Sequence, residues 1–185
     1  MGDIGSIRIF GRFNIGSQSR KALCRVSLLG LGAAFELVSR YVPEMGEIIA
    51  GWEEGRRIGI GILPTGPSIT LEKRGKRIRY MGSGLADPKV SLLFKNFSAG
   101  VLLFTGQIGA AQAVAENRVC VHGNNHEAME VTHALAVVQT YLFPGIIIRN
   151  TFKRPPVLNI RQKARKALVL SLVTPVIAGA AFRKA

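Results

Sequence analysis

The sequence predicts an α/β protein of the α+β class, in which five strands are preceded, interrupted and followed by helices. In residues 58–81, apolar side chains recur at every second position, which is the period of a half-buried strand. On either side, residues 21–41 and 124–143 form longer apolar stretches that end at a proline, as helices do. These observations favour a sheet in the middle of the chain with helices packed around it.

Two strands of the predicted sheet form a hairpin. Residues 68–73 and 76–81 are joined at Arg74-Gly75, and in both strands apolar side chains alternate with polar ones. We therefore expect one face of the hairpin to join the core and the other to be basic and exposed to solvent. The other expected strands cover residues 58–63, 89–94 and 118–122.

Start and stop signals place the helices at residues 21–41, 44–52, 97–105, 109–117 and 124–143, and from 160 onward. Gly106 can end one helix in a left-handed conformation. Asn124 and Glu127 are spaced as a capping box for another helix.

We expect three segments in one domain-sized chain. An N-terminal arm and helix pack on the domain over residues 1–52, where residues 6–15 form a short strand or an extended arm. The core follows at 53–145, and a basic extension with a helix at 146–185. That helix begins with basic turns and carries no charge from 167 to 182, so it packs on the domain, lies in a membrane interface or covers a pocket.

The charge balance favours an anionic partner, because 25 basic residues face 11 acidic ones, giving a net charge of +14. Aromatic residues are few, and no basic segment carries the interleaved aromatics that stack on bases, so nucleic acid is not the expected partner. Cys24 and Cys120 are isolated in apolar runs, which indicates reduced buried thiols and a cytoplasmic protein.

Residues for catalysis are sparse, and we expect no enzyme and no cofactor. Asp3 and Asp87 are the only aspartates, and neither a nucleophile elbow nor a phosphate-binding loop occurs. His126, Glu130 and His133 would share a helical face as metal ligands do, although the HExxH pattern is not present. A solvated, capped first turn explains the same residues more simply, and a metal-dependent enzyme is the third alternative.

Two helical segments are apolar on all sides, at residues 101–104 and 134–138. Such a helix is either buried on every side or faces an apolar ligand. A helix buried in the core is the simpler interpretation. The wall of a lipid pocket is the more specific functional hypothesis.

Residues 78–143 resemble the sterol-carrier-protein (type two) lipid-transfer family. The matching segments are DPKVSLLF at residues 87–94, LLFTGQI at 102–108, and NRVCVHGN at 117–124 after an alanine-rich stretch at 111–115. They stand in the order of the family's strand, leucine-rich helix and following strand, and a final helix comes after them.

The resemblance implies a mostly antiparallel five-stranded sheet covered on one side by helices, with an apolar tunnel for acyl chains or sterols between them. It also implies the residues that would line such a tunnel: Phe94, Val101, Leu102, Phe104, Ile108, Ala111, Val114, Met129, Leu135, Val138 and Leu142.

Together these features predict a non-catalytic lipid-binding or lipid-carrier domain that is peripheral at anionic membranes. The residues expected to contact the membrane are basic: Arg74, Lys76, Arg77, Arg79, Arg161, Lys163, Arg165 and Lys166. The alternative is a structural or assembly module of the same fold without ligand transfer, and a homo-oligomer is open in either case.

Overall fold

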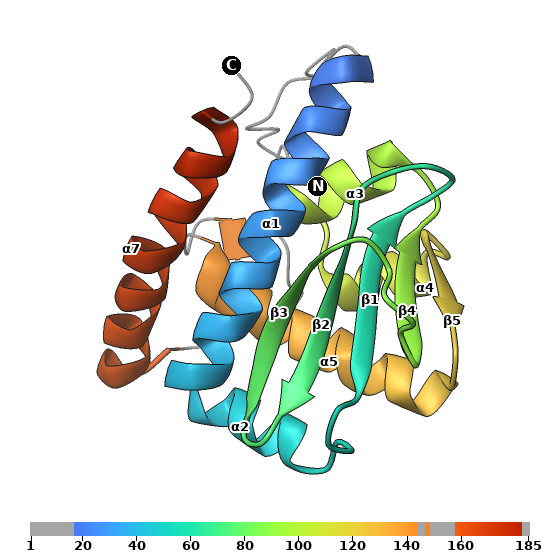
Figure 1. Ribbon diagram of the computed structural model, residues 1–185. Helices are drawn as coiled ribbons and strands as arrows, with labels where there is room; N and C mark the ends of the chain where they lie inside the picture. Colours follow the sequence, from blue (N-terminus) through green and yellow to red (C-terminus); the bar gives the residue numbers. More distant parts are fainter. Residues whose placement is uncertain (1–16, 144–146, 149–157, 183–185) are drawn as a thin grey trace, which may run out of the picture.

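The computed structural model describes residues 17–143, 147–148 and 158–182 (Figure 1). The arm predicted at residues 6–15 lies outside the described residues. In chain order the elements are α1 (Ser17–Tyr41), α2 (Pro43–Ala50), β1 (Arg57–Ile62), β2 (Ser68–Arg74), β3 (Arg77–Ser83), β4 (Val90–Phe94), α3 (Phe97–Phe104), α4 (Ala110–Ala115), β5 (Val119–His122), α5 (Asn125–Leu142) and α7 (Ile160–Phe182).

The five strands form one sheet in the order β3-β2-β1-β4-β5. Strand β1 runs parallel to β4, and the other three neighbouring pairs are antiparallel. The predicted five-stranded, mostly antiparallel sheet is therefore confirmed. Its central strand, β1, alternates isoleucine with glycine because the isoleucine side chains join the core, whereas the glycines leave room on the other face of the sheet. A Cβ at Gly59 would come within 2.7 Å of Leu85 Cδ2, so glycine lets the β3–β4 connection lie close against the sheet.

Helices α1, α3 and α5 lie against one face of the sheet, and α7 packs outside them on α1 and α5 (Figure 1). Helix α1 belongs to the same core as the strands, because Leu28 and Phe35 are buried in one cluster with Ile60 and Leu92. By length and composition, residues 21–41 of α1 could cross a membrane, but half of that segment is buried inside the domain. The apolar character of α1 therefore has an explanation in packing.

The second face of β2 differs from the prediction. Thr70 and Glu72 were expected to be exposed to solvent, yet their exposed fractions are 1% and 7%. The β3–β4 connection covers this face: the Thr70 hydroxyl donates to Gly84 O and accepts from Ala86 N. Glu72 receives hydrogen bonds from two flanking arginines, which hold the pKa of its carboxyl below the ordinary value. The prediction of a wet basic face is right only for β3, where Arg77 and Arg79 are exposed.

The capping box predicted at the start of α5 forms only in part. Asn124 caps α5, since its side chain accepts from His126 N at 2.8 Å. Glu127 does not close the capping box that was expected; its carboxylate pairs with Lys89, at 3.1 Å, on the side of the sheet. Glu127 thus forms an ion pair with a residue distant in the sequence instead of the local hydrogen bond of a capping box.

Gly106 has the left-handed conformation that was predicted, with φ at 70°, and a Cβ there would collide with Ile147. We expect Gly106→Ala to lower the free energy of unfolding by at least about 1–2 kcal/mol, since an L-residue is strained at this φ. The matched control is Gly46→Ala in α2, where the added methyl meets nothing within 4 Å. Urea denaturation should show Gly46→Ala unchanged or more stable; equal losses in the two variants would contradict the argument.

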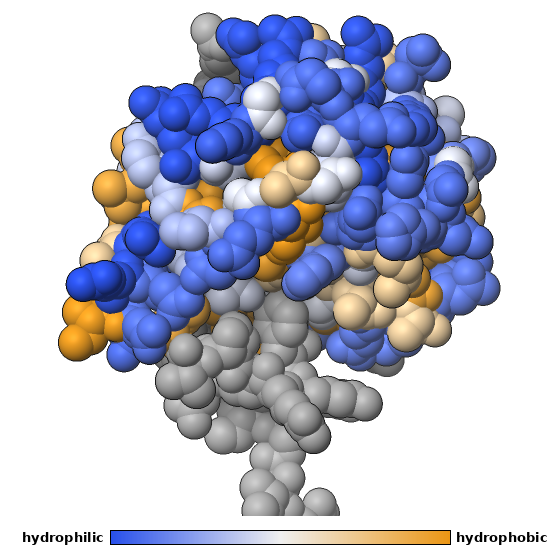
Figure 2. All heavy atoms as spheres, turned by 90° about the horizontal axis from the view of Figure 1, so that it is seen from below, coloured by the Kyte–Doolittle hydropathy of each residue, from blue (hydrophilic) through white to orange (hydrophobic). Residues whose placement is uncertain are grey.

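Large hydrophobic side chains reach the surface unevenly. Four of the seven that are exposed among the described residues belong to α7: Ile160, Leu168, Leu172 and Val176. Figure 2 views the molecule from the lower end of Figure 1 and shows a largely hydrophilic surface, with hydrophobic residues at the left edge, in the centre and at the lower right. The helix is uninterrupted although it contains Pro175.

Candidate functional site

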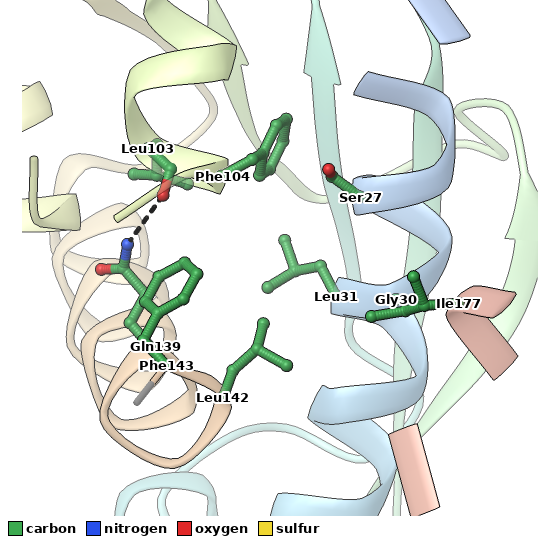
Figure 3. Close-up of a pocket in the computed structure, with 9 residues that line it drawn as sticks. All are labelled: Ser27, Gly30, Leu31, Leu103, Phe104, Gln139, Leu142, Phe143 and Ile177. Carbon is green, nitrogen blue, oxygen red and sulfur yellow. Dashed lines mark hydrogen bonds between the residues drawn. The ribbon is translucent and has the colours of Figure 1, made fainter. Parts of the chain in front are cut away.

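An apolar pocket of about 160 Å³ opens between α1, α3, α5 and α7 (Figure 3). Its lining residues come from the middle of α1, the end of α3, the end of α5 and the last turns of α7. They are Ser27, Gly30, Leu31, Leu103, Phe104, Gln139, Leu142, Phe143 and Ile177. All except Ser27 and Gln139 are nonpolar, which is the composition of a site for an apolar ligand.

The wall from α1 depends on helical spacing and on a glycine. Ser27, Gly30 and Leu31 are three and four residues apart, so they share one side of the helix. Ile177 of α7 packs directly on Gly30, where a Cβ would come within 2.7 Å of Ile177 Cγ1. Glycine at this position therefore allows α7 to approach α1 closely and close one side of the pocket.

Gln139 shapes the pocket from α5. It is 1% exposed, and its Oε1 accepts from the backbone N–H of Ala110 at 2.9 Å. Its Nε2 donates to Leu103 O at 3.5 Å, as the dashed line in Figure 3 shows. The amide thus ties α5 to both sides of the α3–α4 junction. Ser27 is the other polar lining residue, and Figure 3 shows its hydroxyl at the edge of the pocket.

The size of the pocket limits what it holds as it stands. Cavities of about 150 Å³ accept a benzene-sized group, whereas sites for whole small ligands are roughly 300–1,000 Å³. The pocket therefore fits a single ring or a short stretch of an acyl chain. A longer ligand requires movement of one wall or extension out of the opening.

Two of the predicted tunnel residues, Phe104 and Leu142, line this pocket. The others lie elsewhere. Buried in the core are Phe94, Ile108, Leu135 and Val138, and partly buried against it are Val101, Leu102 and Val114. Ala111 is exposed, and Met129 is 61% exposed, so these two point away from the helix–sheet interior.

The core beneath the pocket is continuous with it. Phe94 of β4 packs edge-on against Phe104, with ring centroids 5.8 Å apart. Phe104 therefore has two roles, since one part of its ring contacts the sheet and the side chain also lines the pocket. A ligand in the pocket would rest on side chains that are already held by the sheet.

The basic residues predicted to contact membranes form two groups. Arg74, Lys76, Arg77 and Arg79 are exposed on the β2–β3 hairpin. At the start of α7, Arg161 and Lys163 are exposed, while Arg165 and Lys166 are half-buried. Lys166 Nζ donates to Thr140 O at 2.8 Å, and burial lowers the pKa of this lysine. Part of the second group therefore faces α5 instead of solvent.

The proposed metal ligands do not form a site. His126 Nε2 lies 3.8 Å from Glu130 Oε1, but Glu130 Oε2 accepts a hydrogen bond from Arg56 at 2.7 Å. Across the described residues, no group of three histidine, cysteine or acidic side chains is close enough to hold a metal ion. The interpretation as a metal-dependent enzyme gains no support from this arrangement.

An ion-pair cluster that the sequence did not reveal lies at the start of α5. Arg56 is 5% exposed; its guanidinium donates to Glu130 at 2.7 Å, lies 4.0 Å from Glu127 and stacks 4.8 Å from the Trp52 ring centroid. In the sequence Arg56 stands in a charged turn after Trp52, with its partners more than 70 residues away. The only local signal is the three-residue spacing of Glu127 and Glu130, which puts them on one side of a helix.

Comparison with known proteins gives a likeness of fold. No protein-family model matches the chain. No curated protein matches it either. The solved structures that it resembles include sterol carrier proteins. One is a UbiJ-SCP2 ubiquinone synthesis protein, with a TM-score of 0.39 and 9% identity over 56% of this chain and 90% of that one.

Two further structures carry the sterol carrier name. Sterol carrier protein domain 2 of Helicoverpa armigera has a TM-score of 0.38 and 17% identity, over 58% of this chain and 84% of that chain. Sterol carrier protein 2 from Yarrowia lipolytica has a TM-score of 0.37 and 11% identity, over 70% and 94%. The likeness to these three structures is one of fold.

Proposed function

We propose that the protein is a non-catalytic lipid-binding or lipid-carrier domain that holds part of a fatty acyl or sterol-like ligand. The observation that carries this proposal is the pocket between four helices, whose lining is nonpolar except for Ser27 and Gln139. Gln139 already bonds the protein backbone through both its oxygen and its nitrogen. A ligand for this site therefore offers mainly hydrocarbon, with at most one polar group near the Ser27 hydroxyl.

The exposed basic side chains favour action at the surface of an anionic membrane. Exposed arginines and lysines on the β2–β3 hairpin and at the start of α7 attract anionic lipid headgroups, to which the net charge of +14 adds a long-range term. The protein is then a cytoplasmic one that meets membranes at their surface. It takes up or releases lipid there.

A second candidate function is a structural or assembly module of the same fold. The size of the pocket favours it, because about 160 Å³ is less than the roughly 300 Å³ at which sites for whole ligands begin. Such a module would form a stable complex and would retain no lipid. Native mass spectrometry of the purified protein separates the two candidates.

The test is a titration of the delipidated protein with parinaric acid, a fluorescent fatty acid. Ser27→Phe should weaken saturable binding at least about tenfold, because the ring occupies the space of the ligand and burial of a short hydrocarbon segment accounts for such a factor. The matched control, Ser98→Phe, alters an exposed position of α3 and should bind as the wild type does.

Circular dichroism must show the native helix content in both variants. If the folded wild-type protein binds no parinaric acid, the lipid proposal fails and the assembly module takes its place. If Ser27→Phe binds as well as the wild type, the ligand does not occupy this pocket.

A further inference from the structure

Helix α7 presents a hydrophobic stripe to solvent. Leu168, Leu172 and Val176 follow one another at four-residue intervals, so they lie along one side of the helix. Their exposed fractions are 41%, 41% and 44%. The adjoining side of the helix holds α7 to the domain through Val169 and Val173, which are buried. Exposed apolar side chains collected on one element mark a contact surface.

Charge indicates what covers this stripe. Arg161 lies seven residues before Leu168, two turns away on the same side of the helix, and Lys163 is also exposed in the first turns, on another side. Residues 160–182 contain no acidic side chain. A basic start followed by an apolar stripe is typical of helices that lie in the interface of an anionic bilayer.

The docked position of α7 carries unfavourable contacts as well as favourable ones. Gln162 Nε2 donates to Glu44 Oε1 at 2.6 Å, but in the described part of the chain Glu44 Oε2 is buried without a hydrogen-bond partner. Lys166 is half-buried, and burial lowers its pKa because the ammonium loses water. Desolvation of charged groups opposes burial, so release of α7 returns two charged groups to water.

Release of α7 also changes the pocket. Ile177 is one of its walls and sits directly on Gly30. When α7 moves away from α1, this side of the pocket opens to the surroundings. The same helix therefore carries both the exposed hydrophobic stripe and Ile177, which lines the pocket.

We propose that the exposed face of α7 docks on an anionic bilayer, and that docking draws Ile177 away from Gly30 and opens the pocket toward the membrane. This inference rests on the proposed function for the anionic membrane surface and for what then enters the pocket, and it adds the movement of α7. The partner to which it commits is the headgroup and upper acyl region of an anionic membrane.

The docking step is tested by sedimentation of the full chain with vesicles of phosphatidylserine and phosphatidylcholine. The double variant Leu168→Glu, Leu172→Glu should bind at least about tenfold more weakly, because two apolar contacts are lost from the interface. The control variant Ser171→Glu, Thr174→Glu adds the same two charges at exposed positions of the same helix. It should retain most of the binding, and vesicles of phosphatidylcholine alone should bind little protein.

The opening step is tested by alkylation of a thiol in the pocket, Ser27→Cys, combined with Cys120→Ser. Cys24 stays silent, because it is buried and burial raises its pKa to about 11. Alkylation by a maleimide should become several-fold faster when phosphatidylserine vesicles are added. The increase should disappear in the Leu168→Glu, Leu172→Glu background and persist with Ser171→Glu, Thr174→Glu.

Three results would overturn the inference: no binding to anionic vesicles, equal binding by the stripe variant and its control, or an alkylation rate that vesicles leave unchanged. A dimer seen by light scattering and dissolved by Leu168→Glu, Leu172→Glu would also overturn it, since a second copy would then cover the stripe. Neither assay contains a fatty acid. A failure of parinaric acid binding is therefore distinguishable from a failure of membrane-driven opening.

Discussion

The variant Glu130→Leu is expected to lose roughly 2–3 kcal/mol of its free energy of unfolding and 5–10 °C of its Tm. Glu130 holds the guanidinium of Arg56 at 2.7 Å, and Arg56 is 5% exposed. Without Glu130 this charge stays buried beside the Trp52 ring, with Glu127 at 4.0 Å as the remaining carboxylate. A buried charge that loses its partner costs more than the pair contributed, which sets the size of the effect.

The double variant Arg56→Met, Glu130→Leu separates that cost from the value of the pair. It should recover to within about 1 kcal/mol of the wild type, because no unpaired charge is left inside the protein. Glu116→Leu is the control, since Glu116 also pairs with an arginine, Arg118, but both side chains are exposed. Chemical denaturation should show no measurable change for Glu116→Leu. A double variant as unstable as Glu130→Leu would mean that packing, and not the stranded charge, explains the loss.

Gln139→Leu should cost about 2 kcal/mol, the penalty for a buried donor without its acceptor. The N–H of Ala110, a residue 2% exposed, loses the Gln139 oxygen at 2.9 Å, and Leu103 O loses its weaker contact. The α3–α4 junction is then released from α5, so the pocket wall formed by Leu103 and Phe104 loosens. We expect weaker parinaric acid binding as well as a lower denaturation midpoint.

Gln112→Leu is the matched control for Gln139→Leu. Gln112 is exposed on α4, and its amide donates to Glu116 Oε1, at 2.7 Å, directly after the same helix. Surface substitutions of this kind stay within about 0.5 kcal/mol. Equal losses in the two variants would show that the Gln139 amide has no special role in holding the α3–α4 junction.

Local signals predicted most of the fold. The five strands lie within two residues of the predicted ranges, three of them predicted from alternation of apolar residues, and Gly106 has the left-handed conformation expected after α3. These features depend on residues close together in the chain. Burial of Glu72 depends instead on the β3–β4 connection, which folds back over β2. Sequence period alone therefore assigned the wrong environment to one face of that strand.

The pocket was harder to predict than the fold. Phe104 and Leu142 were expected to face a ligand, and they do line the pocket. Ser27 and Gly30 were missed, because their role depends on where α7 docks against α1. No spacing within α1 contains that information. Ile177 was missed for the same reason, since the tail helix had several possible positions.

Helical period would have corrected one predicted tunnel residue. Met129 lies four residues before His133, so both point to the same side of α5, and both are exposed. The buried side of that helix passes through Ala128, Leu135 and Val138. Apolar character was given more weight than position, and Met129 was assigned to the interior on that basis.

The four walls of the pocket come from positions spread over 151 residues, from Ser27 to Ile177. During synthesis the chain emerges from its N-terminus, so three walls are available before the last one exists. Until α7 is made, the cleft between α1, α3 and α5 lacks the wall that Ile177 supplies, so we expect lipid to enter it without any helix having to move. We therefore expect that loading during translation, in the presence of membranes, fills the protein more readily than addition of lipid to the completed fold.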